Sequence, residues 1–459
     1  MPNGWRRVRD EGEMSNTFEV DAEFSQSQSS WHLGRQRRLI QCLRGDRIHW
    51  AYRNREVNMN IINENLSESG NTLTPHYWQK FKRWEQVTAD QWNDWRWQYQ
   101  NLVSTPEEVV DLFPSLSGEV AKIRSTMGKY KFECTPYYMS LINPDDELDP
   151  IKLQAIPSQL EMRLEPGVDL RDPLNEDGDM PVPGLVHRYP DRVLFLITEI
   201  CSVYCRFCTR RRVILEKTSH IDRQIDRGIE YISQHPEIHD VIISGGDALV
   251  VGEKLLESVL ARLRALPHIY TLRIGSRIPV VCPMRITPQL VSMLAKYKPL
   301  YFMTHFNHPA ELTPEAKKAC ALLVDNGIPM MNQSVLLRKV NSCPHILRDL
   351  FYGLIRMRVK PYYLYQCDLS EGIGHFRTPV AKGIEIMHAL RGFMSGLAIP
   401  TFVIDAPGGG GKIPVLPNYV VKKEKDKIIL QNYEGKRFEY PEPPDTDCDC
   451  STSAQFGGT

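Results

Sequence analysis

Apolar runs alternate with amphipathic segments through the second half of the chain. Segments such as EKLLESVLARLRAL and PEAKKACALLVDNG carry apolar residues every three or four positions, as helices packed on one face do. Six short β-rich runs are separated by such segments, at 193–197, 240–244, 270–275, 300–305, 329–334 and 359–366. Continuous apolar strands that alternate with helices indicate parallel βαβ units. The pattern predicts an α/β fold, with a partial, TIM-type (β/α)6 barrel over residues 186–400.

The rest of the chain follows other patterns. Residues 1–75 are polar and irregular, and we expect an N-terminal extension that is partly disordered. Residues 76–185 are predicted to be a helical region, because aromatic and aliphatic residues recur there at helical spacing. Within this region, Thr105 and Glu108 have the spacing of a capping box. Residues 401–459 form a separate C-terminal segment in this prediction.

Polar residues cluster where the predicted strands end. In parallel barrels, the loops after the C-terminal ends of the strands carry the catalytic groups. A series of polar strand ends is hard to explain as surface decoration, so we expect one mouth lined by these loops. It would hold a cysteine loop after the first strand, the turn 244–247, His305, Gln333 and Asp368.

Composition and charge exclude several classes of protein. The 459 residues carry 56 basic and 56 acidic side chains, so no global field favours nucleic acid or an anionic membrane. No apolar run reaches the roughly 18 residues that span a membrane, and the stretch MPNGWRRVRDEGEMSN lacks the apolar core of a secretory signal. The 11 cysteines are no disulfide framework in a chain of this length. We therefore expect a cytoplasmic protein in a reducing compartment.

Three cysteines in the run CSVYCRFC, Cys201, Cys205 and Cys208, are the strongest chemical signal. Three thiolates at this spacing can hold three irons of a cubane 4Fe–4S cluster, whereas electron-transfer clusters are closed by four cysteines. The fourth iron is then open, and an open coordination position is where metal chemistry occurs. Two interpretations compete with this one: a zinc site that needs a fourth ligand, and a chance grouping of structural cysteines.

A second candidate site lies in the run IDAPGGGGKIPV, where the glycines 408–411 precede Lys412. The run lacks the spacing of a phosphate-binding P-loop, because Ile413 stands where a hydroxyl is required. Four glycines give a backbone that can approach a ligand closely, and a lysine on such a loop can form a Schiff base. From the local sequence alone, a solvated loop lysine is the favoured interpretation.

Six long motifs together resemble the lysine 2,3-aminomutase family of radical S-adenosylmethionine enzymes, over roughly 92–450. They are CSVYCRFCTRRR, SGGDAL, THFNHP, NQSVLLR, PYYLYQCDLSEGIGHFRTPV and TFVIDAPGGGGKIPVLPNYV. The resemblance implies a six-unit partial barrel with a 4Fe–4S cluster, S-adenosyl-L-methionine and pyridoxal 5′-phosphate. It also implies an isomerase that moves the α-amino group of free L-lysine to the β carbon through a 5′-deoxyadenosyl radical.

The resemblance assigns residues to these cofactors. Lys412 would carry pyridoxal phosphate, and Arg188, Tyr189 and Arg192 of the RYPDR motif would contact its phosphate, which suits the paired donors of arginine. A surface ion-pair face remains the alternative for either arginine alone. The implied contacts of S-adenosylmethionine are Phe207, Gly245, Gly246, Asp247, His305 and Gln333. A lone histidine or glutamine at a strand end is otherwise often a structural residue.

The resemblance also assigns the substrate contacts. Arg210 would bind the substrate carboxylate, while Asp368 and Asp405 would receive the distal ammonium. Two carboxylates in a closed mouth favour a compact cation and reject an acidic side chain. Glutamate-specific relatives replace these aspartates by a lysine and an asparagine, so glutamate is disfavoured as a substrate.

Two other substrates stay open. Two carboxylates can also hold a guanidinium, and departures such as MMNQ and VILEK keep arginine 2,3-aminomutase as the first alternative. Modification of a protein-bound lysine in a translation factor is the more remote alternative, because that group of enzymes resembles a shortened aminomutase.

The resemblance fails at one point. The family binds structural zinc with a cysteine in an NDC-type segment and a C-terminal CxCxxC, which correspond here to Cys343, Cys448 and Cys450. The third cysteine of the tail falls on Ser453, and three thiolates do not complete a tetrahedral site. Zinc is either completed by another ligand or lost. The family further implies a homo-oligomer, either dimer or tetramer, and an electron donor such as flavodoxin or ferredoxin.

Overall fold

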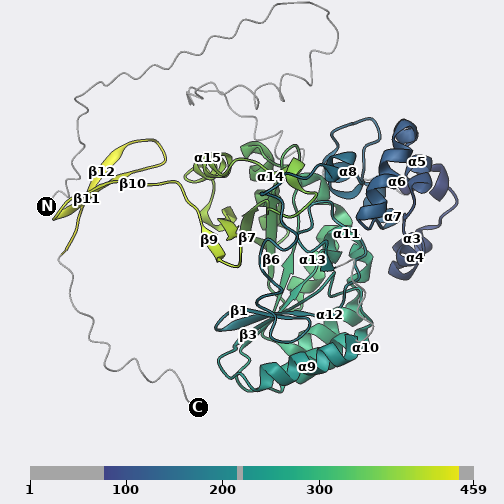
Figure 1. The fold of residues 1–459 in the computed structure, drawn as a ribbon, viewed down its shortest axis with the longest axis horizontal. Coiled ribbons are helices and arrows are strands. Elements are labelled where there is room, and N and C mark those ends of the chain that lie inside the picture. Colours follow the sequence, from purple (N-terminus) through teal and green to yellow (C-terminus); the bar gives the residue numbers. More distant parts are fainter. Residues whose placement is uncertain (1–76, 214–220, 444–459) are drawn as a thin grey trace, which may run out of the picture. The chain divides into compact units, whose positions relative to one another are not determined.

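The computed structural model describes residues 77–213 and 221–443, and its ribbon is shown in Figure 1. These residues belong to two compact units, which divide between Leu416 and Pro417. The larger unit holds the sheet and the helices, and the smaller one holds three strands. The predicted N-terminal extension, residues 1–75, lies outside the described residues.

The larger unit opens with short helices, and in all of them but α6 the N-cap side chain accepts a hydrogen bond from the first turn. They are α3 (Ala89–Asn93), α4 (Trp95–Gln100), α5 (Pro106–Leu112), α6 (Val120–Lys129), α7 (Pro136–Ser140) and α8 (Pro150–Ala155). The capping box predicted at Thr105 is confirmed, because its hydroxyl accepts a hydrogen bond from the Glu108 N–H while the Glu108 carboxylate accepts one from the Thr105 N–H. Trp92, which is 1% exposed, stacks on Trp78 at 4.8 Å and anchors this region.

One nine-stranded sheet forms the wall of the barrel. Its strands are β1 (Leu185–Tyr189), β2 (Arg192–Leu196), β3 (Asp240–Ser244), β4 (Thr271–Gly275), β5 (Leu300–Thr304), β6 (Met330–Leu336), β7 (Val359–Gln366), β8 (Thr401–Ala406) and β9 (Gly411–Pro414). They lie in sequence order, so β1 and β9 form its edges. Neighbours from β2 to β8 pair in parallel, whereas β1 and β9 pair antiparallel.

Further helices connect the parallel strands and pack on the sheet (Figure 1). They are α9 (Ile221–Ser233), α10 (Glu253–Arg264), α11 (Ile278–Val281), α12 (Pro288–Leu294), α13 (Pro314–Asp325), α14 (Pro344–Arg356) and α15 (Val380–Leu390). Strand residues such as Val241, Ile243 and Leu272 are fully buried in the same core as Leu256 and Leu260 of α10. Burial of these apolar side chains stabilises the βαβ units.

The predicted partial α/β barrel is confirmed, and the six predicted strands correspond to β2–β7. The structure adds a seventh parallel strand, β8, which then turns back into β9. Residues 401–416, which we assigned to the C-terminal segment, therefore lie in the sheet. The run TFVIDA is followed by Pro407 and four glycines, and these residues indicate a loop rather than a further βα unit.

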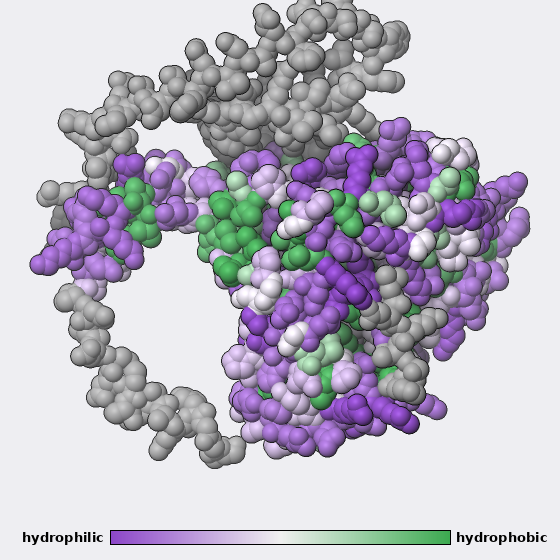
Figure 2. Space-filling view, viewed as in Figure 1, coloured by the Kyte–Doolittle hydropathy of each residue, from purple (hydrophilic) through white to green (hydrophobic). Residues whose placement is uncertain are grey.

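The smaller unit is a three-stranded antiparallel sheet of β10 (Val420–Lys423), β11 (Lys427–Gln431) and β12 (Arg437–Pro441). On the larger unit, Figure 2 shows a mostly hydrophilic face with apolar side chains gathered near α15 and β9. Exposed apolar residues of this region include Phe393 and Leu397, which follow α15, and Ile413 of β9.

Candidate functional site

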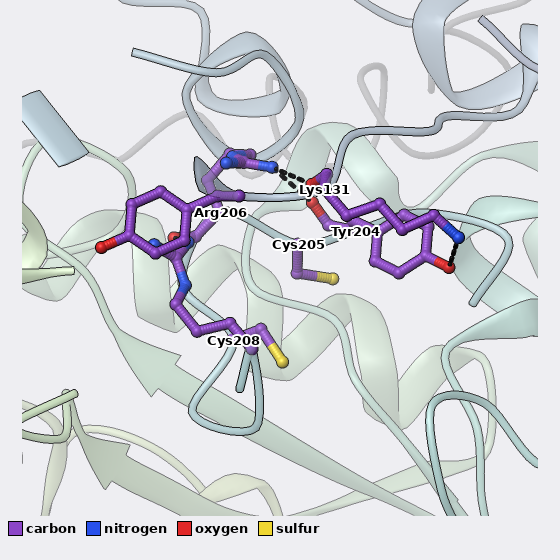
Figure 3. Close-up of a pocket in the computed structure, with 7 residues that line it drawn as sticks. Lys131, Tyr204, Cys205, Arg206 and Cys208 are labelled. Atoms are coloured by element: carbon purple, nitrogen blue, oxygen red, sulfur yellow. Dashed lines mark hydrogen bonds between the residues drawn. The ribbon is translucent and has the colours of Figure 1, made fainter. Parts of the chain in front are cut away.

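The cysteine loop follows β2 and is pinned to the N-terminal helical region. The Tyr204 N–H donates to the Glu133 carbonyl at 3.1 Å, and the Arg206 N–H donates to the Gln154 carbonyl at 2.9 Å. Figure 3 shows the Cys205 and Cys208 side chains on this loop, where they line a small cavity. The other residues that line the cavity are Tyr130, Lys131, Tyr204, Arg206 and Arg211.

The three thiols lie close enough for their charges to affect one another. Burial raises the pKa of Cys201, and the charges of Cys208 and Asp247 act in the same direction. Burial likewise raises the pKa of Cys208 to about 11, with Cys205 as the next cause. A thiolate there needs a positive partner, and one arginine nitrogen, Nη1 of Arg277, lies 2.8 Å from Cys205 Sγ.

Within residues 77–213 and 221–443, no three His, Cys, Asp or Glu side chains converge on a position for one metal ion. In a cubane cluster each cysteine binds a different iron, so its sulfurs do not converge on one ion. The donor chemistry of three thiols without a fourth protein ligand therefore suits an open cluster better than a single zinc ion.

Arg277, which comes directly after β4, connects this loop to the protein interior. Besides Cys205, its guanidinium bonds to Tyr138 Oη at 3.0 Å, Gln154 Oε1 at 2.8 Å and Glu311 Oε1 at 2.7 Å. Sequence analysis missed this residue, although it follows the third predicted strand. The rule that polar residues after the ends of parallel strands line the site applies to this strand as to the other five, so it also predicts Arg277.

The Gly-Gly-Asp turn packs against the loop that carries the cysteines. A Cβ on Gly245, whose φ is +141°, would lie 2.2 Å from the Thr198 carbonyl oxygen, and one on Gly246 would lie 2.3 Å from that of Ile200. The turn therefore needs glycine at both positions. The Asp247 carboxylate accepts from the Ser276 hydroxyl at 2.7 Å and from the Arg277 N–H at 2.8 Å, so it fixes the turn against the end of β4.

The other predicted contacts of S-adenosylmethionine lie at neighbouring strand ends. Burial, together with the charge of Arg277, lowers the pKa of His305 to about 3, so the imidazole is neutral. Its ring lies 5.3 Å from the ring of the buried Phe207, and its Nε2 is 3.2 Å from Asn307 Oδ1. Gln333 lies half-buried on β6, in register with Tyr363. Their predicted roles stay predictions.

Lys412 lies on β9, directly opposite Asp405 of β8. Its Nζ donates to Asp405 Oδ1 at 2.9 Å and lies 5.3 Å from the centre of the Tyr365 ring. The Lys412 side chain is 33% exposed and the Asp405 side chain 10%. The ion pair is thus closed on one side and reachable from the other.

The RYPDR residues surround the glycine loop. The Tyr189 hydroxyl accepts a hydrogen bond from the Lys412 N–H at 2.8 Å, and the Arg192 guanidinium stacks on the Tyr189 ring at 3.8 Å. A Cβ on Gly409 would lie 3.2 Å from Nη1 of Arg188. The three predicted phosphate contacts are therefore brought together beside Lys412, although Arg188 and Arg192 also pair with Asp179 and Asp191.

The predicted substrate carboxylates meet at the same mouth. Asp368 accepts a hydrogen bond from the Thr209 hydroxyl at 2.6 Å. Burial raises the pKa of Asp368, Asp405 and Glu176 act in the same direction, and Thr209 and Lys412 oppose them, which leaves the pKa at about 6. Both aspartates and the Lys412 ammonium thus act on one another across a short distance.

Arg210 is held by a carboxylate that sequence analysis missed. Its Nε donates to both oxygens of Glu176, at 2.9 Å and 3.2 Å. Glu176 lies in the acidic run NEDGD, which gave no sign of a site by itself. Thr209 was also missed, although it directly follows the third cysteine of the motif.

The zinc prediction falls mostly outside the described residues. Cys343 lies directly before α14, while Cys448, Cys450 and Ser453 belong to the part of the chain that is not described. A zinc site therefore stays a prediction.

Comparisons with known proteins agree with the motifs. A family model described as lysine-2,3-aminomutase matches residues 387–457. The L-lysine 2,3-aminomutase of Clostridium subterminale is 52% identical and covers 81% of this chain and 91% of that protein. The L-lysine 2,3-aminomutase of Bacillus subtilis is 48% identical, over 80% of this chain and 78% of that protein.

A relative with another substrate in its name is also similar. The glutamate 2,3-aminomutase of Clostridioides difficile is 41% identical over 78% of this chain and 85% of that protein. Among solved structures, Streptococcus suis SuiB bound to S-adenosylmethionine covers 65% of this chain and 70% of that one at 11% identity, and its TM-score of 0.33 is too low to support an argument. The identity to the aminomutases over most of both chains is decisive, and the chain belongs to the lysine 2,3-aminomutase family.

Proposed function

We propose that this protein is an isomerase that converts free L-lysine to β-lysine by moving the α-amino group to the β carbon. Relatives about half identical over four fifths of the chain carry the name L-lysine 2,3-aminomutase. The proposal also requires that the site receive a lysine side chain, which its charges support.

The observation that carries the proposal is the position of the Lys412 ammonium. This group is chemically the distal end of a lysine, and it lies 2.9 Å from Asp405 while its charge also acts on Asp368. A mouth with two aspartates that already accommodates one primary ammonium suits the side chain of a lysine substrate. An acidic side chain would meet two carboxylates there and be repelled.

The residues present fit pyridoxal phosphate. Lys412 offers a primary amine that is one third exposed. Arg188, Tyr189 and Arg192 supply phosphate donors beside it, and the glycines before it let the backbone come close to a ligand. We therefore assign Lys412 as the catalytic lysine, with those three residues as the phosphate contacts.

The opposite side of the mouth fits an open 4Fe–4S cluster with S-adenosylmethionine. Among residues 77–213 and 221–443, no fourth protein ligand joins the three thiols of the loop, and an arginine beside Cys205 compensates thiolate charge. The Gly-Gly-Asp turn packs closely against the segment that leads into the cysteine loop. When bound, these groups and pyridoxal phosphate would supply radical generation and electron delocalisation, chemistry that side chains cannot perform.

The chain's own part is binding and orientation. Arg210 would receive the substrate carboxylate, and Asp368 with Asp405 would neutralise its distal ammonium. Holding both ends of the substrate fixes the α and β carbons between the cysteine loop and Lys412. The neutral His305 and the buried Phe207 limit water on the cysteine side, since neither brings a charge that needs hydration.

Arginine is the alternative that the charges leave open, because two carboxylates also bind a guanidinium. The MMNQ departure lies at the start of β6, and VILEK lies almost entirely outside the described residues. A protein-bound lysine is disfavoured, because the chain covers 91% of an aminomutase whose name specifies L-lysine.

The test is substrate competition in the anaerobic, reconstituted full-length enzyme. Equal concentrations of lysine, arginine and glutamate are supplied, and the β-amino acids are separated by chromatography. We expect β-lysine as the main product and no β-glutamate. Faster formation of β-arginine would replace lysine by arginine as the substrate, and β-glutamate as the main product would overturn the proposal.

Electron donor, assembly and compartment stay predictions. We propose a flavodoxin or ferredoxin as reductant, a homo-oligomer and a cytoplasmic location, without binding to nucleic acid. In the described parts of the chain, every helix is too short or too polar to cross a bilayer.

A further inference from the structure

A strap, defined as residues 165–184, crosses the mouth without forming a helix or a strand. The Leu170 N–H donates to the Leu369 carbonyl at 2.7 Å, next to Asp368. The Gly408 N–H donates to the Pro173 carbonyl at 2.9 Å, on the loop that leads to Lys412. The strap is thus tied by its backbone to both loops that carry the proposed catalytic and substrate-binding residues.

The strap delivers one buried carboxylate to the site. The Glu176 side chain is only 8% exposed. Its backbone N–H is held by Asp172 Oδ1 at 3.1 Å, and both of its carboxylate oxygens approach Nε of Arg210, at 2.9 Å and 3.2 Å. A carboxylate with so little access to water requires a charged partner, and Arg210 is the nearer of two, since Nη2 of Arg212 lies 3.8 Å from Glu176 Oε2.

The contact uses only one edge of the Arg210 guanidinium. Among the described residues, its hydrogen bonds are all made by Nε, and none is made by its two terminal nitrogens. The Arg210 side chain is 28% exposed, and the charges of Cys208 and Asp405 both act on it. Arg210 therefore lies within the electrostatic range of the cysteine loop and of Asp405.

We propose that Glu176 is a positioning residue, which occupies the Nε edge of Arg210 so that its two terminal nitrogens are presented together to the substrate carboxylate. An arginine can meet a carboxylate side-on, through Nε, or end-on, through its terminal nitrogens. Because Glu176 takes the first edge, only the second remains. This inference rests on the proposed function, since it assumes that Arg210 receives the carboxylate of an amino acid.

The geometry has a consequence for selectivity. A second carboxylate on Arg210 is tolerated only because the two anions use different edges of one planar cation. Loss of Glu176 would let the guanidinium turn, and the substrate carboxylate would lose its paired hydrogen bonds. The distal end of the substrate, held by the aspartates, would not be affected.

The test compares lysine with lysinamide, which has no carboxylate. Dissociation constants are measured by equilibrium dialysis on full-length enzyme loaded with its cofactors, without reductant, so that nothing turns over. Glu176→Ala should weaken the binding of lysine about tenfold or more, as expected for a lost hydrogen bond to a charged group. The binding of lysinamide should stay unchanged. Glu176→Gln, which keeps an acceptor for Nε, should restore lysine binding to within about threefold.

Asp177→Asn is the matched control. Asp177 neighbours Glu176 on the strap, and its side chain is 67% exposed. It pairs at 2.7 Å with Arg212, which also lies 3.8 Å from Glu176 but keeps Asp172 as a partner at 3.1 Å when Asp177 is changed. Its replacement should leave the dissociation constants of lysine and lysinamide unchanged. If Glu176→Ala fails to fold, Glu176→Asp serves instead, because the shorter side chain withdraws the acceptor and should lower the preference for lysine over lysinamide.

Equal weakening of lysine and lysinamide in the Glu176 variants would overturn the proposal, as would unchanged lysine binding. Failure of the proposed function gives another result. If the wild-type enzyme binds arginine rather than lysine, the substrate is wrong, and Glu176 is tested in the same way with arginine and argininamide. If neither amino acid is distinguished from its amide by the wild type, Arg210 is not a carboxylate site and the proposal fails with it.

Discussion

The two sides of the mouth hold their charges differently. On the cysteine side, Arg206 pairs with Glu161 and Arg277 with Glu311, and these four side chains are at most 8% exposed. On the lysine side, Lys412 pairs with Asp405 and Arg210 with Glu176, and each cation is about one third exposed, at 33% and 28%. Each cation on the cysteine side also makes several further hydrogen bonds.

The difference separates scaffold from exchangeable site. A buried ion pair with several hydrogen bonds cannot open without leaving a desolvated charge. A pair that is open on one side can exchange its partner for a ligand of the same charge, because water and the ligand reach it. The cysteine side is therefore built to keep a fixed shape, and the lysine side to exchange charges.

The largest effect is expected on the scaffold. Glu161→Ala removes a carboxylate that accepts hydrogen bonds from Arg206 and Arg211. Because two cations lose their partner in a buried position, the free energy of unfolding should fall by about 3–5 kcal/mol. Urea denaturation of the full chain measures this.

The control for that change is Glu385→Ala on α15, which pairs with Lys382 and whose side chain is 61% exposed. Its replacement should alter the free energy of unfolding by no more than about 0.5 kcal/mol. Similar losses of unfolding free energy in the two variants would show that the buried ion pairs contribute no more than a surface pair. The distinction between the two sides of the mouth would then be wrong.

The second largest effect is on substrate use. Asp405→Asn and Asp368→Asn each remove one carboxylate from the pair that would receive the distal ammonium. The value of kcat/KM for lysine should fall about a hundredfold or more, which corresponds to about 3 kcal/mol. Bound pyridoxal phosphate should stay near the wild-type amount, as measured by its absorbance.

Asp325→Asn, at the exposed end of α13, is the control for general loss of acid side chains. Both site variants should also relax the exclusion of neutral and acidic amino acids, since part of the repulsion is gone. Unchanged preference among lysine, arginine and glutamate would mean that these aspartates do not select the substrate.

The third effect is on pH dependence. Burial, with Asp405 and Glu176, raises the pKa of Asp368 to about 6, so the carboxyl is largely neutral at pH 5. Lysine binding should therefore weaken about tenfold between pH 7 and pH 5. Calorimetric titration of wild type against Asp368→Asn tests this, because the variant should lose most of that dependence.

The pH dependence of folding stability has the opposite sign to that of lysine binding. The folded pKa lies above the ordinary value, so the folded state binds the proton more tightly than the unfolded state does. The resulting stabilisation is complete below about pH 4 and is lost as pH rises through about 6. A wild-type protein whose stability gain over Asp368→Asn instead rose through that window would contradict the assigned shift.

The smallest effect is expected from substitutions in the glycine loop, where Gly411 and Gly408 should respond differently. Gly411 and Gly408 have positive φ angles of 78° and 71°, so alanine is strained at both. A Cβ at Gly411 would lie 3.0 Å from the Tyr189 hydroxyl, whereas one at Gly408 meets nothing within 4 Å. Gly411→Ala should therefore displace Lys412 and lower the yield of borohydride-trapped pyridoxal adduct by a few-fold, about 1 kcal/mol, relative to Gly408→Ala. Equal yields would show that the Tyr189 contact does not position the lysine.

The sequence alone determined the elements and most of the candidate residues. Periodicity identified six of the parallel strands, because an apolar run between amphipathic helices is a local signal. The spacing of Cys201, Cys205 and Cys208 and the glycines before Lys412 marked two sites for the same reason. Strand β8 was not predicted, because Pro407 and the glycine run follow it and indicate a loop.

Only the tertiary structure decided which charges face one another. Glu176 lies 34 residues before Arg210 in an acidic run, and neither the run nor its spacing points to an arginine. Lys412 meets Asp405 because β9 folds back on β8, and Arg277 reaches Cys205 because β4 ends beside the cysteine loop. Such partners are fixed by strand order and burial, since a desolvated charge must find its counter-ion wherever the fold brings one.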